Sequence, residues 1–206
     1  MVARQFVVVG HDAPTEPGFS LDDLPGAGRL DLLCRCVTAT FLLSHDIRSE
    51  VRVRLVLGDE YTVRFEGPEL QGLNPDERST AALVRTALEQ RREAVGHVPV
   101  ETSPGVFLTR RGFEGALAAA AEEGTVVGLH EAGVPCVERT PPADPVFVLS
   151  DHRDFTDAEQ ARLEEVASVR VSLSPRRLHA DQAVTVAHNW LDTGGHAPWD
   201  SGGCNG

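Results

Sequence analysis

The fold is decided by the last third of the chain, residues 145–191, which read PVFVLSDHRDFTDAEQARLEEVASVRVSLSPRRLHADQAVTVAHNWL. The apolar run at 146–149 predicts a buried strand, and residues 157–166 have the pattern of an amphipathic helix. A second strand is expected at 169–173 and a final helix at 179–191. Strands that alternate with helices in this way favour an α/β domain with a mostly parallel sheet and helices on both of its faces.

The same alternation extends toward the N-terminus. A strand is predicted at 5–9, and a loop rich in glycine, proline and aspartate separates it from a buried helix at 29–44. Residues 51–57 and 61–65 alternate around a Gly-Asp-Glu turn and predict a β-hairpin. The remaining expected elements are a helix that starts after Asn74-Pro75 and runs to about Ala94, an irregular segment at 97–108, a helix at 113–123 closed by Gly124, and a strand at 125–129 followed by a turn at Ala132-Gly133.

These elements form one predicted domain at residues 1–192. Residues 193–206 hold five of the 19 glycines and no apolar period, so we expect a flexible tail. No apolar run approaches the roughly 18 to 20 residues that cross a bilayer. The first residues lead into a strand without a signal-peptide cleavage site, which predicts a cytoplasmic protein without a membrane anchor.

The charge of the chain is unusual. It has 31 acidic and 19 basic residues among 206, a formal net charge of −12, and every basic residue is arginine. An acidic surface without lysine is typical of a protein from a halophilic archaeon, because concentrated salt screens the repulsion between carboxylates. A GC-rich genome would also replace lysine with arginine, but it would not by itself require the excess of acids.

The cysteines do not predict a metal site or a disulfide framework. Cys34, Cys36, Cys136 and Cys204 are scattered and form no Cys-x-x-Cys pair, so we expect buried, reduced thiols. Carboxylates lie beside imidazoles at Asp151-His152 and at 179–181, which is compatible with acid–base chemistry or with metal ligation. No His-x-x-x-His lies on a predicted helix, so no metal is expected, and Asp181 lies where a helix cap would stand.

Three predicted strands end abruptly in small or polar residues, at 127–130, 148–152 and 171–175. Ligands of open α/β sheets bind outside the carboxyl ends of the strands, where loop backbone groups are free, so the three ends could form one cleft. The sequence has neither Gly-x-Gly-x-x-Gly after the first strand nor a phosphate-binding loop with Gly-Lys-Ser/Thr, which excludes the common nucleotide motifs.

Several arginines are candidates for contact with an anion. Arg29 stands at a predicted helix start, where its guanidinium could face an anion or a carboxylate of another subunit. Asp31 and Arg35 are four residues apart, and an ordinary intrahelical ion pair also explains them. The other candidates, for which a solvated surface is the alternative, are Arg78, Arg110-Arg111 and Arg176-Arg177.

Long blocks of the sequence resemble the archaeal tRNA pseudouridine-54 N1-methyltransferases, from about residue 4 to residue 192. The blocks are RQF at 4–6, LPGAGRLDLLCRC at 24–36, FLLSHDIR at 41–48, PDER at 75–78, SPGV at 103–106, PVFVLSDH at 145–152, LSP at 173–175 and LHA at 178–180. The resemblance implies a SPOUT-type fold with a C-terminal trefoil knot, which works as a homodimer and binds S-adenosylmethionine at the three strand ends.

The resemblance also implies the cofactor-binding residues. Ser150 stands where relatives often have glycine and would fit if its φ is negative; Ala183 stands where a cysteine is expected. The residues that would contact the cofactor are Leu129, Leu149, Ser150, Ser172, Leu173, Ser174, Pro175, Leu178 and Ala183.

The implied activity is methylation of N1 of pseudouridine 54 in the T-loop of tRNA, which gives 1-methylpseudouridine. We expect Asp151 or Asp181 to act as the base or to orient it, and Arg29, Arg35 and Arg78 to contact RNA or the partner subunit. The alternatives are a related ribosomal RNA pseudouridine N1-methyltransferase and a knotted RNA-binding module without catalysis. A metal-dependent hydrolase is a more distant possibility.

Overall fold

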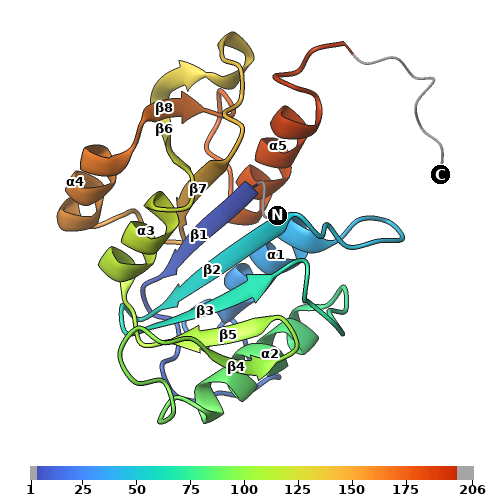
Figure 1. Cartoon of the computed structure of the whole chain (residues 1–206), viewed down its shortest axis with the longest axis vertical. Coiled ribbons are helices and arrows are strands. Elements are labelled where there is room, and N and C mark those ends of the chain that lie inside the picture. The colour runs from blue at the N-terminus through green and yellow to red at the C-terminus, as the bar shows by residue number, and fades with distance from the viewer. Residues whose placement is uncertain (1–3, 199–206) are drawn as a thin grey trace.

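A single eight-stranded sheet organises the chain, in a computed structural model that describes residues 4–198 (Figure 1). The strand order is β4-β5-β3-β2-β1-β7-β6-β8. Strands β2, β1, β7, β6 and β8 are parallel, and β3, β5 and β4 extend the sheet in antiparallel fashion. The strands are β1 (Arg4–Gly10), β2 (Val51–Leu57), β3 (Tyr61–Glu66), β4 (Val100–Ser103), β5 (Val106–Thr109), β6 (Thr125–Pro135), β7 (Pro145–Ser150) and β8 (Val169–Ser172).

Helices cover both faces of this sheet, as the sequence predicts. In β1, Phe6 and Val8 point to the core formed with α1 and α5, while Val7 and Val9 point to the core formed with α3 and α4. The helices are α1 (Leu30–Phe41), α2 (Glu77–Glu89), α3 (Phe113–Ala121), α4 (Asp157–Val166) and α5 (Ala180–Asp192), with a short 3₁₀ turn at Cys136–Glu138. The predicted α/β fold with a mostly parallel sheet is therefore confirmed.

Helix α1 is buried on two sides within this one chain. It packs against the sheet and also against α2 and α5, and Cys34 and Cys36 are fully buried in it as free thiols. Burial raises the pKa of both thiols, which leaves them protonated and unreactive. Cys136 is also buried and free, and Cys204 lies outside the described residues.

Three segments differ from the prediction. Helix α2 ends at Glu89 instead of near Ala94, because the chain tightens into turns in which Gln90 and Arg91 donate to carbonyls three residues back. The segment predicted to be irregular forms the hairpin of β4 and β5. Strand β6 continues through the expected turn at Ala132-Gly133, because after a bulge Val134 pairs again with Val171 of β8.

The last described residues remain in contact with α5. Residues 193–198 form turns in which the amides of Gly194 and Gly195 donate to the carbonyls of Leu191 and Trp190. The remainder of the predicted flexible tail, residues 199–206, lies outside the described residues. Among the helices described, none has the length and apolar character needed to span a membrane.

The loop between β1 and α1 depends on Gly28. Its φ is +60°, and a Cβ atom there would collide with the carbonyl of Asp12. We expect Gly28→Ala to lower the free energy of unfolding by about 1 to 3 kcal/mol, because both the backbone strain and the collision must be relieved. Chemical denaturation measures the change. Gly18→Ala in the same loop is the matched control, since a Cβ at Gly18 meets no atom within 4 Å. Equal stability of the two variants would contradict this account.

Candidate active site

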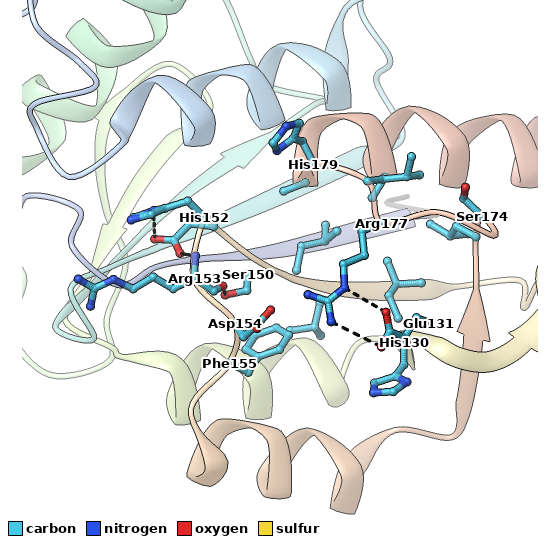
Figure 2. Close-up of a pocket in the computed structure, with 18 of the residues that line it drawn as sticks. His130, Glu131, Ser150, His152, Arg153, Asp154, Phe155, Ser174, Arg177 and His179 are labelled. Carbon is cyan, nitrogen blue, oxygen red and sulfur yellow. Dashed lines mark hydrogen bonds and ion pairs between the residues drawn. The ribbon is translucent and has the colours of Figure 1, made fainter.

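One pocket lies where the ends of β6, β7 and β8 meet the start of α5 (Figure 2). Its volume is 610 Å³, which is within the range of roughly 300 to 1,000 Å³ that small-molecule sites occupy. All three strand ends that the sequence singled out contribute to its wall. The sequence-based prediction that they form one cleft is therefore confirmed.

The pocket wall combines apolar side chains with free backbone groups. Eight of the nine residues that the sequence assigned to the cofactor line it, namely Leu129, Leu149, Ser150, Ser172, Leu173, Ser174, Leu178 and Ala183. Pro175, the ninth, is exposed and outside this lining. Ser150 does not have a positive φ, and its hydroxyl donates to the carbonyl of Arg153 at 2.5 Å. A serine therefore fits at this position without backbone strain.

The rim of the pocket is rich in arginine and histidine. Arg177 pairs with Glu131 at 3.0 Å, and Arg153 pairs with Asp12 at 2.6 Å. Figure 2 shows Arg153, Arg177, His130, His152 and His179 around the pocket, and Arg29 and Arg176 also line it. Three of the four arginines, Arg29, Arg153 and Arg177, are paired with carboxylates.

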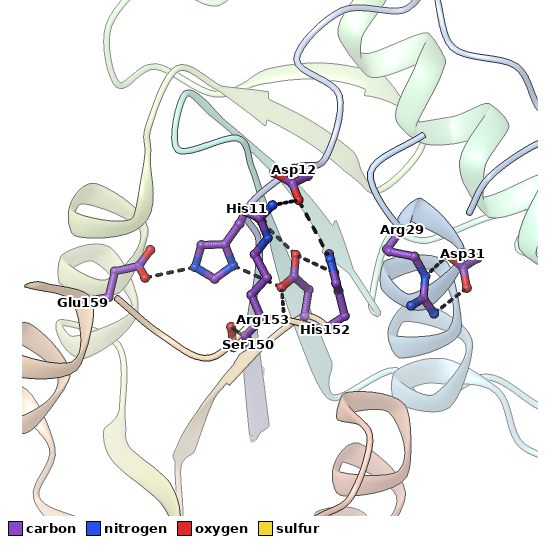
Figure 3. Close-up of polar contacts among 9 residues, drawn as sticks. His11, Asp12, Arg29, Asp31, Ser150, His152, Arg153 and Glu159 are labelled. Atoms are coloured by element: carbon purple, nitrogen blue, oxygen red, sulfur yellow. Dashed lines mark hydrogen bonds and ion pairs between the residues drawn. The ribbon is translucent and has the colours of Figure 1, made fainter. Parts of the chain in front are cut away.

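The ring of His11 lies beside the pocket, between the carboxylates of Asp151 and Glu159 (Figure 3). Its Nδ1 lies 3.1 Å from Asp151 Oδ1, its Nε2 lies 3.0 Å from Glu159 Oε2, and its backbone N–H donates to Asp151 Oδ2 at 2.9 Å. Thr156 is the N-cap of α4, and its backbone N–H donates to the Glu159 oxygen that His11 contacts. The His11 ring therefore links Asp151 and Glu159, which hold the two ends of the loop at 151–156. Ring nitrogens between two carboxylates both act as donors when the imidazole is protonated.

The electrostatics of this contact favour the charged ring. Burial lowers the pKa of His11, but the hydrogen bonds to Glu159 and Asp151 outweigh it and raise the pKa above the ordinary 6.5. Burial likewise raises the pKa of Glu159, and the hydrogen bonds from His11 and Thr156 bring it below its ordinary value. Asp12 and Arg153, which pair with each other, lie close to His11 and complete the group of charges (Figure 3).

The two aspartates predicted to act in catalysis occupy different environments. Asp151 lines the pocket, but its carboxylate is fully buried and accepts hydrogen bonds from His11 and from the backbone N–H of Arg153. Asp181 lies in the first turn of α5, outside the pocket lining, and its carboxylate is 3.5 Å from Arg35 Nε. Asp181 is not the helix cap that was also considered, because His179 occupies that position.

The three arginines predicted to contact RNA or a partner subunit do not lie together. Arg29 stands at the N-cap of α1 and lines the pocket. Its guanidinium donates two hydrogen bonds to the Asp31 carboxylate, at 3.0 and 3.2 Å. Arg35 forms the expected intrahelical pair with Asp31 at 3.0 Å and reaches Glu77 of α2 at 3.1 Å. Arg78 is exposed and pairs with Asp22. Only Arg29 is brought to the pocket.

Sequence reasoning missed His11 and Glu159. His11 directly follows β1, the strand that pairs with β7 in parallel, so the ends of both strands lie at the same edge of the sheet. The position of His11 directly after a predicted strand could therefore have marked it as a site residue. Its partners Asp151 and Glu159, however, are 140 and 148 residues away in the sequence. Within residues 4–198, no group of three or more histidine, cysteine or acidic side chains is arranged to hold a metal ion.

Comparison with known proteins identifies the family. The model of a family described as "Putative SAM-dependent RNA methyltransferase" matches residues 3–196. The chain belongs to this family. The tRNA (pseudouridine(54)-N(1))-methyltransferase of Haloarcula marismortui is 69% identical over 193 residues, which cover 93% of this chain and 98% of the relative. The protein of the same name from Haloferax volcanii is 65% identical, with coverage of 94% and 98%.

The family extends beyond halophilic archaea. The tRNA (pseudouridine(54)-N(1))-methyltransferase of Methanocella arvoryzae is 42% identical, with coverage of 91% and 97%. Among solved structures, Archaeoglobus fulgidus Nep1 bound to S-adenosylhomocysteine aligns with a TM-score of 0.62 at 12% identity, over 92% of this chain and 97% of that one. This structural likeness shows a shared fold.

The pocket fits the cofactor of this methyltransferase family, S-adenosylmethionine. Apolar side chains such as Leu129, Leu173 and Leu178 suit an adenine ring, and the ends of β7 and β8 leave backbone groups free for its polar edge. The rim adds charged side chains that can meet an amino-acid moiety. S-Adenosylmethionine is therefore the cofactor for which the residues of this pocket are suited.

The His11 contact predicts a pH-dependent stability. Because the pKa of His11 is raised in the folded chain, its contribution is complete below pH 6.5 and is lost as the pH rises through the raised value. We expect His11→Gln to lower the free energy of unfolding by about 1 to 3 kcal/mol at acidic pH and by less at alkaline pH. Denaturation of both proteins across the pH range measures this difference. His45→Gln, at an exposed position, is the control, and a difference for His11→Gln that does not change with pH would contradict the assignment.

Proposed function

We propose that this chain transfers the methyl group of S-adenosylmethionine to N1 of pseudouridine 54 in the T-loop of tRNA. The observation that carries the proposal is the pocket built by three strand ends in a chain up to 69% identical to enzymes of that name. Because the substrate is a tRNA, we place the activity in the cytoplasm.

The reaction requires removal of one proton. S-Adenosylmethionine, when bound, supplies an electrophilic methyl group on its sulfonium sulfur. N1 of pseudouridine forms the new C–N bond and loses its hydrogen as a proton, while the C–S electron pair stays on sulfur. An imide-like N–H is a weak nucleophile, so a nearby acceptor for this proton favours the transfer. Holding N1 in line with the methyl group contributes much of the remaining rate.

We assign the acceptance of that proton to His152. It lines the pocket, and its ring lies between Asp151 and Asp12, with Nδ1 3.6 Å from Asp151 Oδ2 and Nε2 3.9 Å from Asp12 Oδ2. The buried carboxylate of Asp151, held by His11, would then orient the imidazole instead of taking the proton itself. In this arrangement Asp181 has no part in proton transfer.

The arginine-rich rim would hold the RNA around the target nucleotide. Arg177 extends from the loop before α5 and Arg153 from the loop after β7, and these two arginines lie on different sides of the pocket (Figure 2). Arg176, beside Arg177, also lines the pocket. Guanidinium groups bind phosphate oxygens with paired hydrogen bonds. Arg29 would assist from α1, whereas Arg35 and Arg78 would stabilise the contacts of α1 and α2 with neighbouring segments.

The family resemblance further implies a trefoil knot and a homodimer. What supports both assignments is the family to which the chain belongs. The exposed face of α5, with Gln182, Thr185 and Asn189, is the surface that we assign to the partner subunit. The two-sided burial of α1 is satisfied within one chain and does not require a partner. A crystal structure with an unknotted trace, or light scattering that gives a monomer, would contradict these assignments.

The activity can be tested with two matched tRNA substrates. In pseudouridine N1 carries a hydrogen, whereas in uridine the same position forms the glycosidic bond and cannot be methylated. We expect the purified protein to methylate a tRNA with pseudouridine at position 54 and to leave the tRNA with uridine 54 unchanged. Mass spectrometry of the digested nucleosides measures the product. Equal labelling of both tRNAs, or labelling of neither, would refute the proposal.

The role of His152 predicts a contrast between two variants. Removal of a general base lowers rates by roughly 10² to 10⁴-fold. We expect His152→Asn to lower kcat by about 10²-fold with an unchanged affinity for S-adenosylhomocysteine, and Asp181→Asn to keep kcat within about twofold. Single-turnover kinetics and calorimetry measure the two quantities. A larger loss of kcat in Asp181→Asn than in His152→Asn would reverse the assignment.

A further inference from the structure

Half of the sheet has a face that no helix of the described chain covers. In Figure 1, α1 and α2 lie behind β3, β5 and β4, while α3 packs on β1, β6 and the end of β2, and α4 packs on β6. The uncovered face is not apolar. Cross-strand pairing places Arg54, Arg64 and Phe107 in one row across β2, β3 and β5, and Arg52 beside Glu66 in the next row.

The positive charges on this face are crowded. Arg54 and Arg64 are direct cross-strand partners, an arrangement in which like charges destabilise a sheet. Three guanidinium groups, those of Arg52, Arg54 and Arg64, share the carboxylates of Glu66 and Glu123, and the charge of Arg111 lies close enough to affect Arg54. Glu101 lies at the outer end of the row, beyond Phe107. We call the four arginines with Phe107 the arginine face.

The carboxylates are shared unevenly among the guanidinium groups. Arg52 Nε and Arg64 Nε both lie against a single oxygen of Glu66, at 2.6 and 2.8 Å, in a geometry that forms no hydrogen bond. Arg111 Nε is buried without a hydrogen-bond partner among the described residues. Burial lowers the pKa of Arg54 to about 9, and the charges of Arg52 and Arg64 add to the effect. Arg54 is only 3% exposed and donates to Gln5 and Glu123, whereas Arg64 and Arg111 are partly exposed. The outer part of the face is therefore the part that a ligand can reach.

This crowding is unexpected in a chain with 31 acidic and 19 basic residues. Acidic side chains are abundant elsewhere, yet few of them neutralise this face. Arg64 also lies over the ring of Phe107 at 4.8 Å from its centroid, which gives a flat, partly exposed surface. Arginines beside an aromatic ring on an open sheet are suited to phosphates and bases of a nucleic acid.

We propose that the arginine face binds the sugar-phosphate backbone of the substrate tRNA, away from the methylated nucleotide. The inference rests on the proposed function, because it assumes an RNA substrate. The phosphates would contact the partly exposed guanidinium groups of Arg64 and Arg111. The target nucleotide would enter the pocket at the ends of β6, β7 and β8, while another part of the same tRNA lies against β3 and β5.

The test uses two double variants that remove the same charge from opposite sides of the sheet. Arg64→Gln with Arg111→Gln changes the arginine face at its more accessible positions. Arg85→Gln with Arg92→Gln changes α2 and the residues after it, on the other face, and serves as the control. Binding of an unmodified tRNA transcript is measured by fluorescence anisotropy over a series of potassium chloride concentrations, and binding of S-adenosylhomocysteine by calorimetry.

We expect the first double variant to bind the transcript about tenfold more weakly and to lose about 1 to 2 units of the slope of log K against log salt, because each lost phosphate contact releases fewer ions. Its affinity for S-adenosylhomocysteine should be unchanged, and the control should match the unaltered protein. Unchanged tRNA affinity and slope in the first variant would overturn the proposal. If the unaltered protein methylates no tRNA, the proposed function fails instead.

A second measurement covers the case in which the double variant does not fold. Hydroxyl-radical footprinting of the unaltered protein reports the accessibility of Phe107 with and without the transcript. We expect oxidation of Phe107 to fall several-fold at saturating tRNA, while that of the exposed Val95 and Val98 stays the same. Oxidation of Phe107 that is insensitive to tRNA would overturn the proposal without any substitution.

Discussion

Parallel pairing of β1, β7, β6 and β8 is the constraint on which the site depends. Because parallel strands end at the same edge of a sheet, residues far apart in the sequence meet there, and their loop backbone groups are left free. This pairing places His11 next to Asp151, and the Leu129 region of β6 next to β8, although these residues are far apart in the sequence. The pocket, the loop at 151–156 and the start of α5 are all positioned by this edge, and the helices of both faces hold the strands in register.

The chain has 31 acidic and 19 basic residues, but its arginines are not spread evenly. Several stand at the pocket rim and several on the sheet face of β2 and β3. An acidic surface suits concentrated salt but repels RNA, so binding must depend on such local arrangements. The imidazole of His11 is another local arrangement of this kind, because it lies between the two carboxylates that fix the loop at 151–156.

The sequence predicted the parts of the structure that repeat a local pattern. The strand before Asp151 was predictable because a continuous apolar run ends there in polar residues, and the strand before Ser174 because Val169, Val171 and Leu173 alternate with polar residues. The cleft followed from the parallel order of these strands. The hairpin of β4 and β5 was not predictable, since two strands of four residues beside Pro99 and Pro104 are too short to show a period. The contacts of His11 with Glu159 and of Arg35 with Asp181 join residues more than 140 positions apart, so no local pattern records them. The family resemblance supplied the cofactor, which periodicity alone could not.

The central claim is that this chain makes 1-methylpseudouridine at position 54 of tRNA through the pocket at the three strand ends. Mass spectrometry of tRNA fragments from cells with and without the gene tests it most directly. The account predicts that 1-methylpseudouridine disappears from position 54 in the deletion strain, that pseudouridine remains there, and that ribosomal RNA is unchanged. Restoration by the intact gene, but not by one encoding His152→Asn, would connect the modification to this pocket. Unchanged 1-methylpseudouridine in the tRNA of the deletion strain would contradict the account.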